Sequence, residues 1–321
     1  MSKAVGLALA CTALVFHIFG NSRATAASPP ASLLDIHFAD DATFNISLGG
    51  VWWLGSAPIR AFLGGKWQHL AKTGTARSTG SDVLGEFSCV NVTWASSAGH
   101  VLHTSLKTYA GSDIGIFVQQ IPAGARHTNA SNPTLPGGLR VMDPGNYDPV
   151  VAFPALAGGQ LEELGFVTWQ SRMINVEVGT NVTAGPPGQN EPLIQGRGLQ
   201  GLSTSGPVVL FDEQFNSLVV APMDNFKSAV HHVRDGATVW DTGVSSELTD
   251  LPVGFEHRTM LVGGIGITAT MDAWGRALRR EYNTNHTAVF DRNIEYLSYW
   301  TGKWAHVKRP SAQTIRTQTI S

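Results

Sequence analysis

Apolar and polar residues alternate along several short segments of the chain. In residues 44–48 (FNISL), three apolar side chains alternate with Asn45 and Ser47, which is the period-two pattern of a strand with one buried face. Glycine pairs at 49–50 and 64–65 separate this segment from further short apolar runs. The pattern predicts short strands joined by glycine turns, with Asn45 facing solvent.

Longer apolar segments predict the centre of a large sheet. Residues 101–109 and 114–120 flank a short polar turn, and residues 208–211 and 217–221 flank another, so each pair predicts a hairpin. Residues 114–118 (IGIFV) carry apolar side chains on both faces of the expected strand. Such a strand lies inside a sheet that is covered on both sides.

The period changes from two to that of a helix near residue 270. Met271, Trp274, Leu278 and Tyr282 fall at i, i+3, i+7 and i+11, which predicts an amphipathic helix. Thr270 is the expected N-cap of this helix. The preceding GIGITA (264–269) fits the G-x-G-x-x-A pattern of a dinucleotide-binding turn. Because no second βαβ unit follows, we interpret it as a tight joint between a strand and the helix.

The N-terminus has the pattern of a secretory signal. Lys3 precedes an apolar run over residues 4–19, a short polar stretch, and the small residues Ala24 and Ala26 at the spacing that signal peptidase accepts. The run is shorter than the ~18 to 20 residues of a membrane-spanning helix. We therefore predict a signal peptide over 1–26 and a secreted mature chain with no membrane partner after cleavage.

Sequons and cysteines fit the same compartment. Five N-x-S/T sequons predict N-glycosylation, at Asn45, Asn91, Asn129, Asn181 and Asn285. Cys11 leaves with the signal, so Cys89 is the single cysteine of the expected mature chain. We interpret Cys89 as a buried, inert thiol; the alternative is a missing intermolecular partner.

Composition narrows the class of function. Of 321 residues, 14% are charged and the formal net charge is −2, which excludes the basic field needed for non-specific nucleic-acid binding. His231 and His232 are adjacent, so on a strand they point to opposite faces and cannot share a metal. We predict no metal site and no cofactor.

Tryptophan is the clearest hint of a ligand. The chain has 9 tryptophans and 35 glycines, and a flat indole face stacks well on the C–H face of a sugar. Four tryptophans are candidates for carbohydrate stacking: Trp52, Trp53, Trp67 and Trp300. The alternative for each is packing in the core, because an aromatic ring buries much apolar area.

Hydrolysis of a glycoside needs two carboxylates at a set separation. Asp212, Glu213 and Glu256 are available, but spacing in sequence cannot establish their separation in a β fold. No catalytic residue is therefore assigned.

One region resembles a known family. Residues 252–259 (PVGFEHRT), 264–269, Trp274-Gly275 and 297–301 (LSYWT) resemble the junction region of secreted glycoside-hydrolase-like proteins of lower eukaryotes. These are more distantly similar to raffinose synthases and α-galactosidases. The resemblance spans most of residues 32–301 and is strongest over 208–301.

The resemblance implies a fold and a domain organisation. In that family a large N-terminal β-sandwich ends in a linking helix, and a Tyr-Trp-Thr strand opens a (β/α)₈ barrel. We accordingly expect a mainly β chain, with an antiparallel sandwich of the supersandwich type over 27–270. The linking helix and an orphan first barrel strand are expected over 271–301.

The chain departs from the family after Thr301. Relatives continue with Asp-Asn-Gly and a barrel that carries the catalytic aspartates, whereas this chain reads Gly302-Lys303-Trp304 and has 17 further residues. Gly-Lys-Trp can be encoded by a string that contains a consensus splice donor, so we hypothesise that 302–321 is translated intron.

The expected function is a non-catalytic, carbohydrate-associated N-terminal region of a secreted glycoside-hydrolase-like protein. Two alternatives stay open: a stand-alone sugar-binding module, and an enzyme that uses carboxylates within this chain. The sugar and the oligomeric state are not predicted.

Overall fold

The computed structural model describes residues 32–130, 148–161, 163–169, 176–179, 199, 202, 206–235 and 238–284, and the fold is given for these residues. The expected strand at 293–301, the segment 302–321, the signal segment 1–26, Trp300, Asn181 and Asn285 lie outside them.

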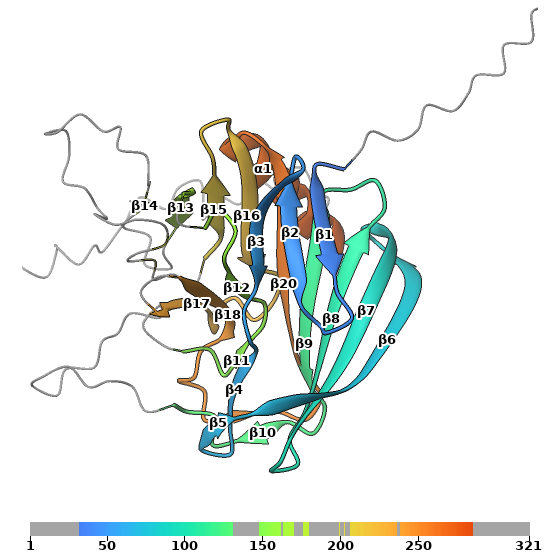
Figure 1. Cartoon of the computed structure of the whole chain (residues 1–321), viewed down its shortest axis with the longest axis vertical. Coiled ribbons are helices and arrows are strands. Elements are labelled where there is room, and N and C mark those ends of the chain that lie inside the picture. Colours follow the sequence, from blue (N-terminus) through green and yellow to red (C-terminus); the bar gives the residue numbers. More distant parts are fainter. Residues whose placement is uncertain are drawn as a thin grey trace, which may run out of the picture.

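Antiparallel strands make up two large sheets and two small ones (Figure 1). The six-stranded sheet has the order β1 (Leu34–Phe38), β2 (Phe44–Leu48), β3 (Val51–Ser56), β12 (Ala155–Ala157), β18 (Val239–Val244), β17 (Ala229–Arg234). The nine-stranded sheet has the order β14 (Val176–Gly179), β13 (Gly165–Trp169), β15 (Val208–Phe211), β16 (Asn216–Pro222), β20 (Phe255–Ile265), β9 (Ile114–Ile121), β8 (Val101–Tyr109), β7 (Gly85–Ser96), β6 (Leu70–Asp82). The small sheets are β11 (Val151–Ala152), β4 (Arg60–Leu63), β5 (Lys66–Gln68), and β10 (Ala125–Arg126) with β19 (Asp250–Leu251).

The main core lies between the two large sheets. Phe44 of β2 contacts Phe117 of β9 with ring centroids 4.9 Å apart, and Phe117 contacts Phe153 at 5.5 Å. Ile46 and Leu48 are fully buried in the same core, whereas Asn45 between them is exposed. The period-two prediction for residues 44–48 is confirmed, and the fold is the predicted antiparallel β-sandwich.

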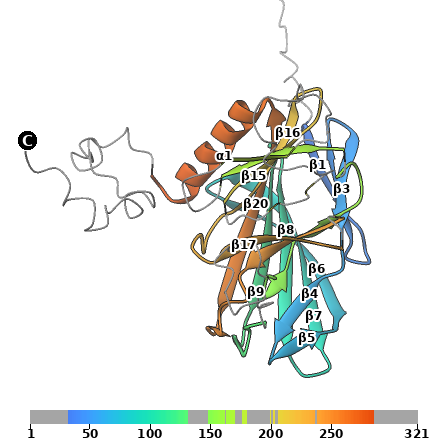
Figure 2. The same cartoon turned by 90° about the vertical axis from the view of Figure 1, so that its left-hand side faces the viewer.

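A single described helix covers the outer face of the nine-stranded sheet. Helix α1 (Ile267–Glu281) lies against this sheet (Figure 2). Its Met271, Trp274 and Leu278 pack against a second buried cluster that includes Ile116 and Val118 of β9. The main core covers one face of β9, and this second cluster covers the other face. This confirms both the amphipathic helix and the strand with two apolar faces.

The joint between β20 and α1 is as tight as the sequence predicts, but its cap differs. Gly266, at φ 85°, occupies the N-cap position, and the helix begins at Ile267. Thr270 therefore lies within the first turn, where its Oγ1 donates to the Gly266 carbonyl at 2.9 Å, and the prediction of Thr270 as the N-cap is wrong. A Cβ on Gly264 would overlap Thr270 Oγ1. The glycines of the G-x-G pattern thus serve close packing and a left-handed turn.

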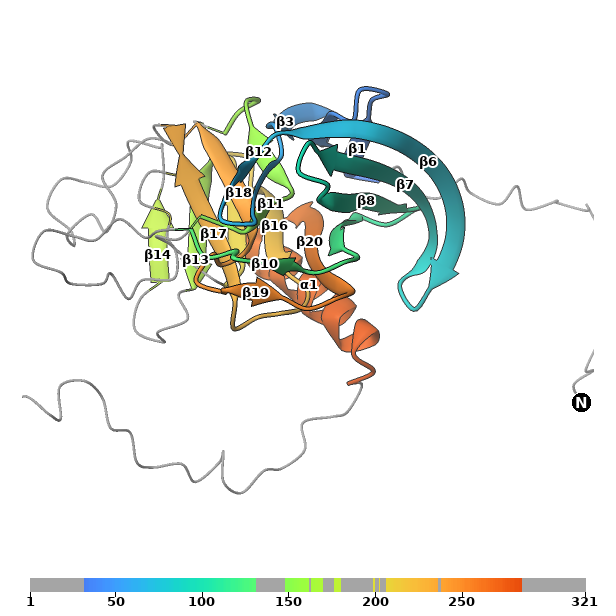
Figure 3. The same cartoon turned by 90° about the horizontal axis from the view of Figure 1, so that it is seen from below.

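The nine-stranded sheet has β14 at one edge and β6 at the other. At the second edge, β6 and β7 form a long curved ribbon (Figure 3). Strand β6 is exposed along almost its whole length. Its Thr, Ser, Lys and Arg side chains give it the polar composition that keeps an edge strand from pairing with other chains.

The one helix that the structure describes is not long and apolar enough to span a membrane.

Candidate functional site

The three stacking candidates that the structure describes, Trp52, Trp53 and Trp67, differ in how exposed they are to solvent. Trp53 is fully buried in the main core, so it cannot stack on a sugar, and that candidate is corrected. Trp52 and Trp67 have exposed fractions of 52% and 41%. Trp52 and Trp53 are neighbours on one strand, and successive side chains of a strand point to opposite faces. The sequence could thus have shown that only one of the two is available.

Trp67 is held by aromatic and cationic contacts. It lies on β5, and the Arg60 guanidinium carbon is 4.4 Å from its ring centroid in a cation–π contact. Phe62, its cross-strand partner, packs edge-on with centroids 5.3 Å apart and an interplanar angle of 78°. The indole is therefore fixed in orientation while part of it faces solvent.

Two carboxylates fix Arg60 in turn. Its Nη2 lies 2.6 Å from Asp148 Oδ1 and 3.2 Å from Asp241 Oδ2. Asp241 is fully buried, and its Oδ2 also accepts a hydrogen bond from Arg234 Nε at 2.8 Å. Burial raises the pKa of Asp241, even though Arg234 and Arg60 act in the opposite direction. The buried end of this network holds the arginine, and its outer end reaches solvent.

The outer end presents polar groups beside the indole. His232 Nε2 lies 3.3 Å from Asp148 Oδ1, and the side chains of Arg60 and Asp148 are about one-third exposed, at 31% and 33%. We call Trp67, Arg60, Asp148 and His232 the Trp67 platform. A partly exposed indole with a carboxylate acceptor and an arginine donor nearby can stack on a sugar ring and hydrogen-bond its hydroxyls.

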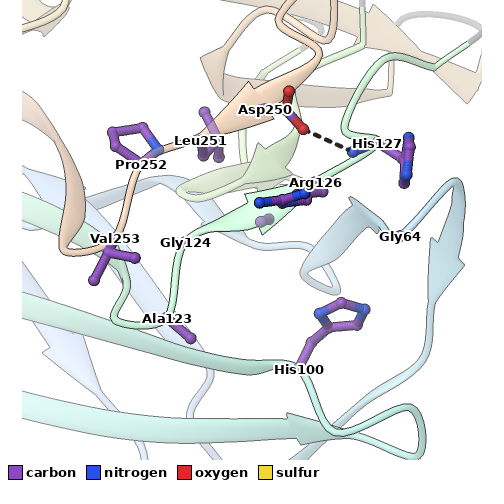
Figure 4. A pocket seen from close by; sticks show the side chains of 11 residues that line it. Gly64, His100, Ala123, Gly124, Arg126, His127, Asp250, Leu251, Pro252 and Val253 are labelled. Carbon is purple, nitrogen blue, oxygen red and sulfur yellow. Dashed lines mark hydrogen bonds between the residues drawn. The ribbon is translucent and has the colours of Figure 1, made fainter.

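An open pocket of about 960 Å³ adjoins the same β4–β5 hairpin (Figure 4). The hairpin turn is bonded to two residues that line the pocket. Gly64 N donates to the Arg126 carbonyl at 3.0 Å, and Gly65 N donates to the His127 carbonyl at 2.8 Å. Its polar lining includes His100, Arg126, His127 and Asp250. Asp250 Oδ1 accepts from His127 N at 3.3 Å. The pocket volume lies at the upper end of the range for small-molecule sites.

Of the three carboxylates considered for hydrolysis, Glu256 lies far from Asp212 and Glu213. Asp212 closes the β15–β16 turn, accepting from Gln214 N and Asn216 N at 2.9 and 2.8 Å. Asn216 pairs with Ile265 at one end of β20, and Glu256 lies nine residues away at the other end. At about 3.3 Å per residue this separates them by about 30 Å. Glycosidase carboxylates are ~5 to 9.5 Å apart, so Asp212 and Glu213 cannot pair with Glu256.

The segment that carries the family resemblance forms an ion network. Asp224 Oδ1 lies 2.9 Å from buried His257 Nδ1, and its Oδ2 accepts from Arg258 Nε at 2.8 Å. Arg258 Nη1 also donates to Glu281 Oε1 at the end of α1, at 2.6 Å. Burial acts to raise the pKa of Asp224, but the bonds to His257 and Arg258 outweigh it, so the pKa is lowered. These residues fasten the C-terminal end of α1 to β20.

The histidine pair diverges as predicted. His231 is buried and accepts a hydrogen bond on Nδ1 from Trp240 Nε1 at 3.2 Å, whereas His232 lies beside Asp148. Within the part of the chain that the structure describes, no three His, Cys, Asp or Glu side chains are grouped so as to hold a metal ion.

The described sequons and the cysteine lie as follows. Asn45 and Asn129 are exposed. Asn91 is half-buried, and its Oδ1 accepts from Ser105 Oγ at 2.7 Å. Cys89 is a buried free thiol, as interpreted from the sequence, and burial raises its pKa.

The architecture is that of a large antiparallel sandwich closed on one face by a helix. No protein-family model matches the chain, and no curated protein matches it. Solved structures with some similarity include a glycoside hydrolase family 97 enzyme from Pseudoalteromonas sp. strain K8, at 10% identity and a TM-score of 0.43. Another is an α-N-acetylgalactosaminidase from Bifidobacterium bifidum in its ligand-free form, at 11% identity and a TM-score of 0.46. They match 73% and 80% of this chain, which spans only 34% and 39% of theirs.

Proposed function

We propose that this chain is the non-catalytic, carbohydrate-associated N-terminal sandwich of a secreted glycoside-hydrolase-like protein. The observation that carries the proposal is the Trp67 platform. It combines a partly exposed indole with a carboxylate, an arginine and a histidine side chain, and groups of these kinds can stack on a sugar and hydrogen-bond its hydroxyls.

Preorganisation supports the assignment. Arg60 is held by Asp148 and the buried Asp241, and it stacks on Trp67. The side chains that would contact a ligand are therefore already ordered, so binding costs less conformational entropy.

The glycoside-hydrolase-like part of the proposal depends on the sequence resemblance. That resemblance is strongest over residues 208–301, and the described part of this region contains β20 and α1, which Asp224, Arg258 and Glu281 hold together. The separation of about 30 Å along β20 between Glu256 and the turn that contains Asp212 rules out a catalytic pair that includes Glu256.

The test is glycan-array screening of the secreted protein, followed by calorimetric titration of the best ligand. We expect Trp67→Ala to weaken binding at least tenfold, since truncating a central aromatic anchor costs about 2 kcal/mol. Asp148→Asn should also weaken binding, because it removes the charge of the acceptor. Trp52→Ala is the matched control, as an exposed indole outside the platform. Binding that survives Trp67→Ala with the fold intact would refute the platform.

The second candidate is a stand-alone sugar-binding module, which the same platform favours. The two differ in what the gene encodes after the codon for Thr301. Sequencing the transcript there distinguishes them: splicing into an in-frame barrel supports the first, and a message that retains 302–321 supports the second. Turnover of an aryl α-galactoside by the purified chain would contradict both.

A further inference from the structure

Trp52, the other exposed indole, lies flat on the outer face of the six-stranded sheet. Its Nε1 donates to the Leu54 carbonyl at 2.8 Å, which orients the ring along its own strand. Its Cζ2 lies 3.4 Å from the position that a Cβ on Gly55 would take, and 3.6 Å from the corresponding position on Gly158. The two glycines leave room for the ring, and 52% of the residue remains exposed.

A sequon asparagine reaches the same point. Asn45 on β2 pairs with Gly55 on β3, and its Oδ1 lies 3.3 Å from the Cβ position of Gly55. The amide of Asn45 and the benzo edge of Trp52 thus converge over a single glycine. A sugar ring attached to Asn45 Nδ2 is long enough to cover the indole.

We propose that Asn45 carries an N-linked glycan and that its innermost N-acetylglucosamine stacks on Trp52. In the covalent step, Asn45 Nδ2 forms a bond to C1 of the sugar and loses a proton. The bond from C1 to the pyrophosphate of a lipid-linked oligosaccharide donor breaks, and the lipid pyrophosphate leaves. The transferase and donor are those of the secretory pathway, so the inference depends on the predicted secretion but not on the Trp67 platform.

The surroundings favour this occupant of Trp52 over a free sugar. The Trp52 Nε1–H already donates to the Leu54 carbonyl, so it is not available to the hydroxyl of a free ligand. A tethered glycan is present at high effective concentration and needs little affinity of its own. Stacking would also cover an apolar surface that is otherwise exposed to solvent.

The other described sequons differ from Asn45. The Asn91 Oδ1 already accepts from Ser105 Oγ and, at 3.4 Å, from Cys89 Sγ. Asn129 is exposed and lies two residues after His127, which lines the pocket. Asn45 is thus the described sequon whose side chain converges with an exposed indole.

The experiment uses the full chain secreted from a eukaryotic host. Glycopeptide mass spectrometry should find hexosamine on Asn45. In isotope-labelled protein, protons of the innermost sugar should shift upfield under the indole ring current, and the shift should vanish in Trp52→Leu with the glycan retained. An unoccupied Asn45, or a glycan whose protons do not shift, would overturn the proposal.

A double-mutant cycle separates stacking from ordinary packing. Asn45→Gln removes the sequon and leaves Ser47, the cross-strand partner of Trp52, in place. We expect Trp52→Leu to lower the unfolding midpoint more in the glycosylated protein than in the Asn45→Gln background. Equal effects in both backgrounds would mean that Trp52 contributes packing alone, which contradicts the proposal. Glycan-array binding that needs Trp67 is independent of either result.

Discussion

Buried His231 should make the sandwich sensitive to mild acid. Its Nδ1 accepts from Trp240 Nε1 at 3.2 Å, so a proton on Nδ1 would place two donors against each other. Burial, with a smaller contribution from nearby His257, lowers the pKa of His231 to about 3, and a hydrogen bond with the backbone of Gly206 opposes the shift only in part. The folded protein therefore keeps this imidazole neutral.

The sign and size follow from linkage. The unfolded chain binds a proton on His231 near pH 6.5, and the folded chain does so only near pH 3. The stability that the neutral ring contributes is complete above pH 6.5 and is lost as pH falls toward 3. Each pH unit costs about 1.4 kcal/mol, so the free energy of unfolding should fall by about 2 kcal/mol between pH 6.5 and 5.0.

The assay is urea unfolding followed by tryptophan fluorescence at pH 7.0, 6.0 and 5.0. His231→Asn keeps an acceptor for Trp240 Nε1 and does not titrate in this range. Its free energy of unfolding should be lower than that of the wild type at pH 7, and about 2 kcal/mol of the difference should disappear by pH 5. His37→Asn, at an exposed position, is the matched control. Parallel curves for the wild type and His231→Asn would refute the reasoning.

Three further predictions concern helix α1 and its attachment to the sheet. Gly264→Ala should destabilise the fold by about 1–3 kcal/mol in urea unfolding, because its Cβ would overlap Thr270 Oγ1. Gly275→Ala, in the middle of α1 with only the end of a flexible arginine nearby, should instead stabilise by about 0.5–1 kcal/mol; the same sign for both would contradict this account. Asp224→Asn should cost about 2–3 kcal/mol, since it weakens hydrogen bonds to Arg258 and a buried histidine. An unchanged unfolding midpoint would show that the network contributes nothing to holding the helix.

Local pattern was sufficient for most of the elements. Alternation over 44–48, the apolar run at 114–118 and the helical spacing from Met271 each predict an element that the structure contains. The start of the helix was misplaced because Thr270 has the chemistry of an N-cap, yet its hydroxyl is needed inside the first turn. Hydrophobic periodicity predicts which face of a helix is buried. The position of the N-cap depends on backbone geometry, and here it is Gly266, whose φ is positive.

The candidate site was only half visible in the sequence. Trp67 stood out by residue type and by the glycines beside it, but nothing pointed to Arg60 or Asp241, which are 181 residues apart. Alternation along a strand showed that Trp52 and Trp53 face opposite ways, but only the packing of the two sheets showed that Trp53 is the buried one. The partnership of Asn45 with Trp52 likewise depends on which residues of β2 and β3 are opposite each other.

The sequence alone determined the β class, the positions of its main strands and helix, and the residue types available for chemistry. These properties follow from side-chain periodicity and turn chemistry within a few residues. The tertiary structure decided which side chains converge, because strand order and register bring together residues far apart along the chain. Burial then decided which of them remain open to a ligand and which are held neutral.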